Sequence, residues 1–468
     1  MRFLYGKKWD KIGIAGAILV IIAVTVLRSI RMPNDWVEAH WLLHYDFGFL
    51  KRAAVGAVLK PFVAMFSDIH NVEILIDTII IVQHIIFGAL LFRSMLRVVS
   101  KGGWAATGVV AMSVFATSAY IVYAAHLIGY FDTTVILLCA AACLLIRRGK
   151  ILLAAILLSL GIFIHEIIMA IGFPVAMFAV LLNLFPPDAA PPQRQIKKRV
   201  IRHLPVILGP PLVFLIFFLV LFHRSGGGEA SRSMVDYLTR FTFIEHDQHR
   251  YVPFWCGVSF MHNLHMEIPK ASERFTDLRY LFHNGLPAAY LLAVLGLFIR
   301  GHRRSYWIVA AAISAAFAPL LLHLIAFDTA RIWSYPILSA YLCLWLIMEF
   351  GHVDATRLLH HSFVPAAGVI LTVMNIFLTV NIKMLDGIEE RFTVTERLLL
   401  YLPPLVVIVG ILLFRARAHS TVAAPPPSPL AGEQLFSDPS ANSHRTSEDA
   451  ESERARPRAH CPDRRGEG

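Results

Sequence analysis

Charged residues are scarce in this chain. Of its 468 residues, 16% are charged and 57% are hydrophobic, whereas a soluble globular protein carries roughly a quarter charged residues. This deficit excludes an ordinary soluble domain, and it is explained if most of the surface faces lipid. The net charge of +11 does not indicate nucleic acid as a partner, because Lys and Arg sit in short loops between apolar runs, as the positive-inside rule requires.

Cysteine is also rare, and several motifs are missing. The five cysteines form no pair that suggests a disulfide framework or a zinc site. His165-Glu166 begins an H-E-x-x-H pattern, but position 169 is Met169, so that metalloprotease motif is absent. There is no Asp-x-Asp pair of the kind that holds a metal beside a nucleotide sugar. No small-residue cleavage site follows the first apolar run, which we therefore expect to be a retained span.

Long apolar runs are abundant. About 20 apolar residues are needed to cross roughly 30 Å of hydrocarbon. The runs predict an all-α, polytopic integral membrane protein with about 12 transmembrane helices in a domain of residues 1–415. These spans are expected near 12–30, 72–92, 104–126, 131–147, 151–165, 167–185, 204–222, 285–299, 306–326, 333–349, 363–380 and 398–414. Residues 416–468, rich in Pro, Ser, Glu and Arg, predict a disordered cytoplasmic tail.

The basic loops predict the orientation. With the N-terminus inside, every strongly basic short loop falls on one side, and an error of one span would scramble that pattern. The cations concerned are Arg93, Arg97, Lys101, Arg147, Arg148, Lys150, Arg194, Lys197, Lys198, Arg199, Arg202, Arg300, Arg303, Arg304, Arg415 and Arg417. We expect a plasma membrane, of the bacterial inner-membrane kind, with both termini cytoplasmic. Two long loops, 31–71 and 223–284, then lie outside.

The loop 31–71 is the densest polar feature. Trp36, His40 and His44 recur every four residues, which predicts a short helix lying in the membrane interface. Asp35 and Glu38 fit a capping box at the start of this helix, and that structural role alone could explain both acids. The sequence leaves open whether they are caps or catalytic groups.

Asp46 follows that helix and has no capping role. Lys51 and Arg52 come shortly after it. An acid beside two cations, next to a lipid surface, suits general-base work on a phosphate-bearing substrate. The alternative for Lys51 and Arg52 is that they reach toward lipid headgroups.

Polar residues also enter the spans, where charge is costly. Glu73, Asp77 and His84 lie four and seven residues apart on one face of the second span. Glu73 could equally be interfacial, whereas Asp77 and His84 lie deeper. His165 and Glu166 interrupt an apolar stretch near the outer surface, either as part of a site or as a short hairpin that reaches water.

A second polar cluster surrounds Arg331, which lies outside against the positive-inside trend and could bind phosphate through a bidentate fork. Asp328 precedes it and could instead cap the next span, and Asp132 likewise begins a span. The stretch from His126 to Asp132 matches the stretch from His323 to Asp328 if one residue is skipped. Duplication and chance agreement in a Leu- and Ile-rich chain both explain the match.

The organisation of residues 1–415 resembles the C-type glycosyltransferase superfamily, whose members use lipid-phosphate-linked sugars. In that superfamily the first extracytoplasmic loop follows the first span and carries an acidic catalytic motif and membrane-parallel helices. That position holds Asp35, Glu38 and Asp46 here. The family usually has two acids that are adjacent or nearly so, whereas this loop spreads its acids over twelve positions.

The resemblance implies transfer of a sugar from a polyprenyl-phosphate carrier to a glycan, lipid or protein acceptor outside the cytoplasm. The acids Asp46 and Glu38 would deprotonate or orient an acceptor hydroxyl. Lys51, Arg52 and Arg331, or a divalent cation, would stabilise the departing phosphate.

Three other functions remain open. A polymerase or ligase of lipid-linked saccharides, or an acyltransferase, would share the outside site and differ in its acceptor. A secondary transporter should place polar or broken-helix features near the midplane of several spans in both halves. A structural or assembly role is the last. The sequence does not identify the sugar, the acceptor, the metal requirement or the oligomeric state.

Overall fold

A computed structural model describes residues 2–422, apart from 102–104, 186–192, 224–227, 246, 248, 250, 252–259, 301–304, 327, 352–362, 379 and 381–389. The chain divides into two units, Met1–Arg415 and Ala416–Gly468. Only residues 416–422 of the second unit are described, so the expected tail beyond them lies outside the described residues. The described residues form helices and contain no strand.

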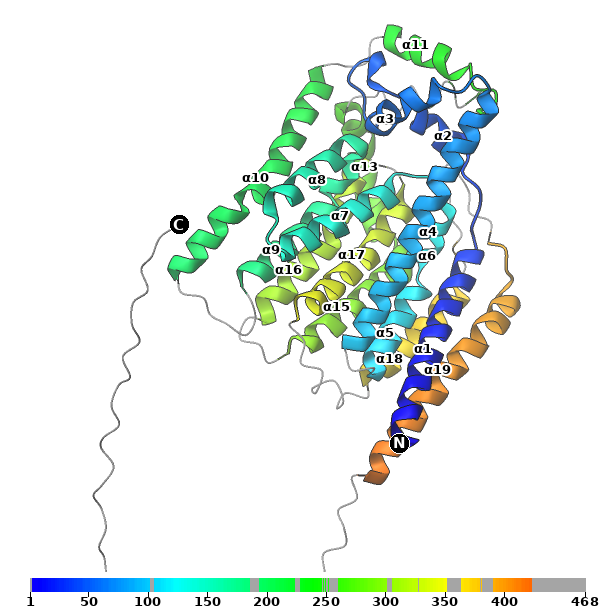
Figure 1. The fold of residues 1–468 in the computed structure, drawn as a ribbon, viewed down its shortest axis with the longest axis vertical. Coiled ribbons are helices and arrows are strands. Elements are labelled where there is room, and N and C mark those ends of the chain that lie inside the picture. Colours follow the sequence, from blue (N-terminus) through cyan, green and yellow to red (C-terminus); the bar gives the residue numbers. More distant parts are fainter. Residues whose placement is uncertain are drawn as a thin grey trace, which may run out of the picture. The chain divides into compact units, whose positions relative to one another are not determined.

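The helices of the first unit are shown in Figure 1. The first half contains α1 (Arg2–Leu27), α2 (Asp35–Leu42), η1 (Tyr45–Phe47), α3 (Ala54–Val63), α4 (Ile69–Lys101), α5 (Ala106–Ala116), α6 (Ala119–His126), α7 (Asp132–Arg147), α8 (Ile151–Ile164), η2 (Glu166–Met169) and α9 (Gly172–Leu184). The second half contains α10 (Gln193–His223), α11 (Gly228–Leu238), α13 (Phe260–Thr276), α14 (Leu278–Tyr280), η3 (Leu281–Gly285), α15 (Leu286–Phe298), α16 (Ser305–Phe317), η4 (Ala318–Leu324), α17 (Thr329–Phe350), α18 (Phe363–Phe377) and α19 (Val394–Val422).

The chain is a multi-pass helical membrane protein by the length and composition of its helices. Nine helical segments among the described residues are long and apolar enough to cross a membrane. Three of the expected spans fall on shorter helices, α7, α8 and α18, of 16, 14 and 15 residues. Since a crossing needs about 20 residues, the count of twelve stays a prediction. The expected span 104–126 is two helices, α5 and α6, which separate at Thr117 and Ser118.

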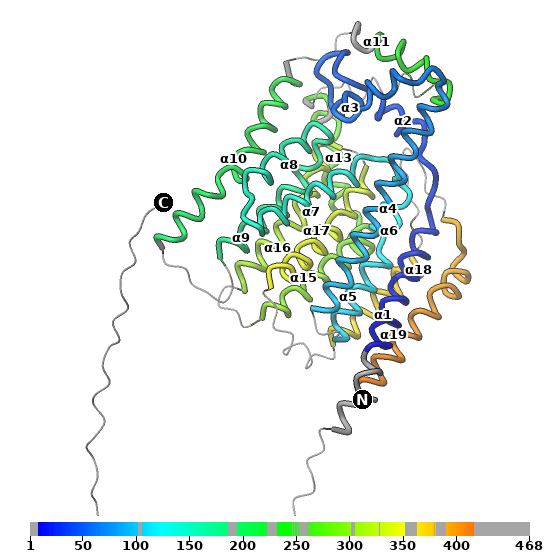
Figure 2. The backbone as a smooth tube through the Cα atoms, in the orientation of Figure 1, coloured from blue at the N-terminus to red at the C-terminus, as the bar shows by residue number. Residues whose placement is uncertain are grey.

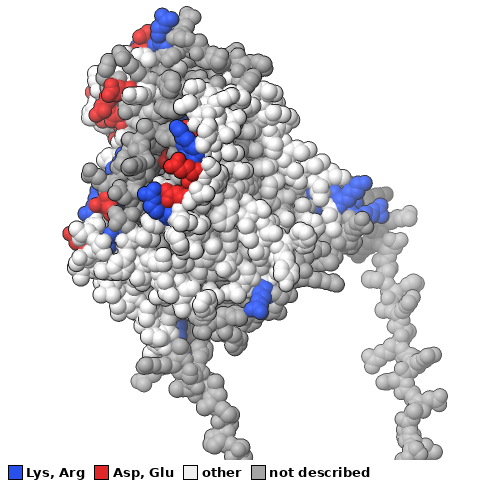
Figure 3. Space-filling model, turned by 180° about the vertical axis from the view of Figure 1, so that it is seen from behind, with Lys and Arg blue, Asp and Glu red and all other residues white. Residues whose placement is uncertain are grey.

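The centre of the bundle is α17, which is buried along its whole length. Its sides pack against α15, α16 and α9, and a helix enclosed in this way is apolar all round. Its far end carries Glu349, which pairs with Arg97 of α4 at 2.6 Å and with Arg147 of α7. Peripheral helices are far less buried, as α4, α10 and α19 show. The broad uncharged surface in Figure 3 agrees with contact with lipid chains.

The segments α2, α3 and α11 gather at one end of the bundle, as the ribbon and the tube both show (Figures 1 and 2). We call these three helices the cap. They bring the two long loops together. The ring of Tyr237 in α11 lies 5.0 Å from that of His44 and 5.3 Å from that of Phe47, both of which follow α2. A separate hydrophobic cluster that includes Val37, Trp41, Met234 and Leu238 fills the space beneath them.

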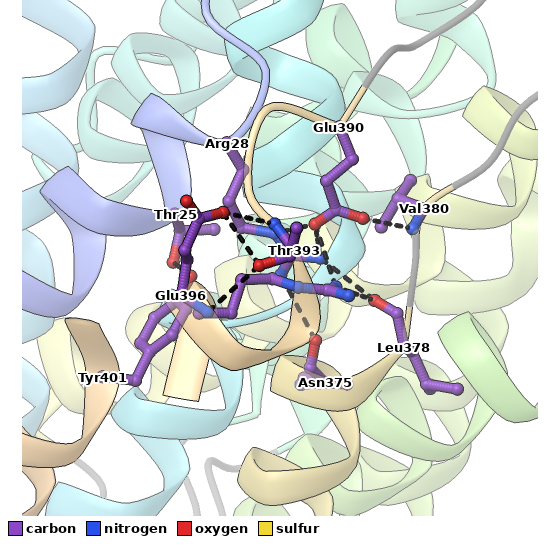
Figure 4. Close-up of polar contacts among 10 residues, drawn as sticks. Thr25, Arg28, Asn375, Leu378, Val380, Glu390, Thr393, Glu396 and Tyr401 are labelled. Carbon is purple, nitrogen blue, oxygen red and sulfur yellow. Dashed lines mark hydrogen bonds and ion pairs between the residues drawn. The ribbon is translucent and has the colours of Figure 1, made fainter. Parts of the chain in front are cut away.

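A buried ionic clamp holds α1 to α19 (Figure 4). The side chains of Arg28 and Arg397 both reach the carboxylate of Glu390, and all three are at most 5% exposed. Both guanidinium groups also donate to the carbonyl of Leu378 at 3.0 Å. The Glu390 carboxylate accepts from the amide of Val380 at 3.1 Å. Because every charge has a partner, the clamp fixes the end of α1 from which the loop 31–71 departs.

Candidate functional site

An ionic cluster lies where α7 and α17 begin. Asp132 is the first residue of α7, and Asp328 immediately precedes α17. Both carboxylates contact Arg331, through Asp328 Oδ2 at 2.8 Å and Asp132 Oδ2 at 3.5 Å. Asp328 occupies the N-cap position of α17, as expected, but its side chain makes no cap hydrogen bond and faces Arg331 instead. The two similar sequence stretches thus converge on one arginine.

Asp132 has a second partner and one oxygen to spare. The hydroxyl of Tyr335 donates to Asp132 Oδ2 at 3.0 Å. Asp132 Oδ1 is buried and has no hydrogen-bond partner among the described residues. It lies 4.0 Å from His165 Nε2. The sequence did not single out Tyr335, because a tyrosine inside an apolar run carries no signal of its own.

His165 and Glu166 join this cluster to the loop 31–71. The amide of Ile167 donates to His165 Nδ1 at 3.2 Å, so the ring proton lies on Nε2, facing Asp132. Glu166 Oε1 pairs with Arg52 at 3.0 Å, and the charge of Lys51 also acts on Glu166. Arg52 has a φ of 63°, the only positive value at a non-glycine residue in the described parts of the chain. Backbone strain of this kind is concentrated at functional sites.

A small hollow lies between α2, the 127–131 turn and His165. Its lining consists of Trp36, Val37, His40, Arg52, Gly129, Tyr130, Phe131 and His165. The guanidinium of Arg331 lies 5.4 Å from the centre of the Tyr130 ring, so the ionic cluster sits directly behind this aromatic wall. The enclosed space is about 10 Å³, about what one water molecule needs, so a larger ligand requires the walls of the hollow to move apart.

His40 presents a buried acceptor in this hollow. Its Nδ1 lies 2.7 Å from the carbonyl of Trp36 and must carry the ring proton, because a carbonyl only accepts. Its Nε2 therefore carries a lone pair, which has no hydrogen-bond partner among the described residues. Burial, assisted by the charge of Arg52, lowers the pKa of His40 to about 3. The ring is neutral at pH 7 and suited to accept a hydrogen bond from a hydroxyl.

Gly129 fixes the turn that forms one wall. Its φ is +91°, and a Cβ there would lie 2.4 Å from Val37 Cγ1. Its carbonyl accepts from the indole N–H of Trp41 at 2.8 Å. Only glycine allows α2 to approach the 127–131 turn so closely.

The acids at the start of α2 lie elsewhere. The N-cap of α2 is Asn34, which accepts from the amide of Val37, so the capping box built on Asp35 is wrong. Asp35 instead accepts from the amide of Glu245 at 2.7 Å. Glu38 is buried, and the carboxyl group of Asp77 in α4 is its neighbour. Neither Asp35 nor Glu38 lines the hollow.

Asp46 is on the surface. It pairs with Lys60 of α3, and its side chain is 58% exposed. The hydrogen bond from Lys60 lowers the pKa of Asp46. The sequence suggested that Asp46 acts beside Arg52 and Arg331. The structure instead pairs it with Lys60, and Asp46 does not line the hollow that Arg52 lines.

The other two residues of the α4 face make separate contacts. His84 Nδ1 lies 2.9 Å from the carbonyl of Ile80, and its Nε2 accepts from Thr133 at 3.1 Å, next to Asp132. Glu73 pairs with His70 at 3.0 Å. Within the described ranges no three His, Cys, Asp or Glu side chains are grouped as metal ligands.

The structure thus brings together Arg52, Asp132, His165, Glu166, Asp328 and Arg331, with His84 one contact away. The sequence missed Tyr130 and Tyr335, and it noted Trp36 and His40 only as an interfacial pattern. Comparison with known proteins adds no identity: no family model, no curated protein and no solved structure matches the chain.

Proposed function

We propose that the protein is a membrane glycosyltransferase that moves a sugar from a polyprenyl-phosphate-linked donor to an acceptor outside the cytoplasm. The observation that carries this proposal is the lining of the hollow. It combines a cation, Arg52, with the aromatic rings of Trp36 and Tyr130 and the bare Nε2 of His40. Aromatic rings can pack against the faces of a sugar, a neutral imidazole accepts from a hydroxyl, and a guanidinium binds phosphate bidentately.

In this proposal Asp132 takes over the base role that the sequence favoured for Asp46. Its Oδ2 is held by Arg331 and Tyr335, which leaves Oδ1 available. Asp132 lies behind the lining of the hollow, 4.0 Å from Nε2 of His165, which lines it. With the walls moved apart by the substrate, the acceptor hydroxyl reaches past His165, gives its proton to Oδ1 and forms the new bond to the anomeric carbon. The bond from that carbon to the phosphate oxygen breaks, and its electron pair leaves on the phosphate beside Arg52.

The test is transfer in vitro by purified protein with a panel of polyprenyl-phosphate sugars. Asp132→Asn should reduce turnover by about 10²–10⁴-fold, the contribution of a general base, while donor binding persists. Asp46→Asn is the matched control and should keep its activity. Loss of turnover in Asp46→Asn alone would show that Asp46, and not Asp132, is the base. Absence of both transfer and binding across the whole panel would contradict the proposal. A lipid-linked saccharide product would assign the polymerase or ligase alternative.

A secondary transporter is the second candidate, because Glu38 and Asp77 form a carboxyl pair that can hold a proton. A proton-coupled transporter needs such a group. Uptake into proteoliposomes that follows an imposed pH gradient, and is lost in Glu38→Gln, would favour transport over transfer.

A further inference from the structure

A dense group of cations lies at the opposite end of α7 from Asp132. Its members belong to the α7–α8 turn and to the first three turns of α10, and they are Arg147, Arg148, Lys150, Arg194, Lys197, Lys198, Arg199 and Arg202. We call this group the basic face. Its two parts are joined, because Arg202 donates to the carbonyl of Gly149 at 3.0 Å.

The basic face has almost no acid to balance it. Arg147 pairs with Glu349, whereas the other seven cations have no carboxylate partner in the described part of the chain. From Thr133 to Ile164 and from Ile167 to His223, the only acidic residue is Asp188, which lies outside the described residues. Most of these side chains are exposed.

The length of α10 places these cations relative to a bilayer. Residues 204–223 form an uncharged stretch of 20 residues, which spans about 30 Å at 1.5 Å per residue and matches the hydrocarbon core. Leu208, Leu212 and Leu215 are more than half exposed along it, as lipid-facing residues are. The preceding basic turns must therefore lie at the level of the headgroups.

We propose that the basic face binds anionic phospholipid headgroups of the leaflet that it meets. Clusters of four to eight Lys and Arg next to a span attract anionic lipids, and the attraction is electrostatic and screened by salt. Seven of these cations lack a carboxylate partner in the described part of the chain, and all lie at the depth of the headgroups, which favours a lipid over a soluble acidic partner. This proposal does not depend on the activity of the protein.

The test uses spin-labelled phosphatidylglycerol and phosphatidylcholine with the full chain in phosphatidylcholine vesicles. The wild type should immobilise phosphatidylglycerol preferentially, and the preference should fall at about 1 M salt, where the Debye length is about 3 Å. Lys197→Gln/Lys198→Gln should lose most of it, and adding Arg194→Gln should remove more. These exposed residues make no contact that holds the fold, so the variants should melt like the wild type.

The control is Arg240→Gln/Lys270→Gln, which removes two exposed charges from the loop 223–284 and should keep the full preference. An unchanged preference in Lys197→Gln/Lys198→Gln, or one that resists salt, would overturn the proposal. So would a wild type that shows no lipid preference yet retains poly-glutamate, since that result would assign the basic face to an acidic polypeptide.

Discussion

Glu38 of α2 and Asp77 of α4 are neighbouring carboxyl groups, and the charge of Asp77 opposes ionisation of Glu38. Burial of Glu38, with the nearby charges of Asp77, Asp35 and Glu73, raises its pKa to about 8. The neutral form of Glu38 is therefore favoured up to about that pH. Ionisation of Glu38 would place like charges together where α2 packs against α4.

Stability should therefore depend on pH through Glu38. The pKa of Glu38 is about 8 in the folded protein and near 4.5 in the unfolded chain. Its contribution to the stability of the fold is therefore complete below about pH 4.5 and is lost as the pH rises through about 8. Glu38→Gln has a similar shape, stays neutral and does not titrate. We expect the Tm of the wild type to fall relative to that of Glu38→Gln between about pH 5 and about pH 9. Parallel melting curves across this range would contradict the assignment.

Gly129→Ala should destabilise the protein by about 1–3 kcal/mol, because it combines strained backbone with a clash against Val37. Gly88→Ala is the control, since a Cβ there meets nothing within 4 Å, and it should be neutral or stabilising by up to about 1 kcal/mol. Thermal unfolding followed by tryptophan fluorescence measures both. Equal changes in stability for the two variants would show that the 127–131 turn can shift to accommodate a Cβ atom.

Arg331→Gln should cost about 3–5 kcal/mol, because it leaves Asp132 and Asp328 buried without their cation. Adding Asp328→Asn removes one of these uncompensated charges, so the double variant should recover part of the loss. Arg331→Lys should not restore full activity, because an ammonium lacks the planar fork that meets both carboxylates. A double variant no more stable than Arg331→Gln would mean that the pairing has no energetic role.

His40→Leu tests the bare acceptor in the hollow. We expect donor affinity to weaken about tenfold, the value of roughly one hydrogen bond, with little change in Tm. His44→Leu is the matched control: it lies four residues on, stacks on Phe47 at 4.6 Å and does not line the hollow. Equal losses of affinity in both variants would place the ligand elsewhere.

The sequence predicted the helices because apolar runs of this length have no other stable form in lipid. It also singled out Arg331, Asp132 and Asp328, because charged residues beside spans are rare. It could not show that they meet, since Asp132 and Arg331 begin two helices, α7 and α17, that are far apart in the chain and come together only in the folded bundle. Hydropathy also did not predict the break between α5 and α6 at Thr117 and Ser118.

The choice among the acids failed for a different reason. Asp35, Glu38 and Asp46 share one loop, and their roles depend on what each faces: the 245 amide, Asp77 and Lys60. A local pattern also mistook Asp35 for the N-cap, because Asn34 beside it serves equally well. Which side chains line the hollow is set by a turn almost 90 residues away in the chain.

The clamp of Arg28 by Glu390 also orders events during synthesis. Until the ribosome has delivered the 390–397 segment, the first helix ends in a cation that lacks its carboxylate at the edge of the membrane, which is a costly state. The end of α1 therefore reaches its final ionic environment only after residues 390–397 have been made. A premature stop just before residue 390 should let α1 pack against α5 and α6 but leave Arg28 buried without its carboxylate.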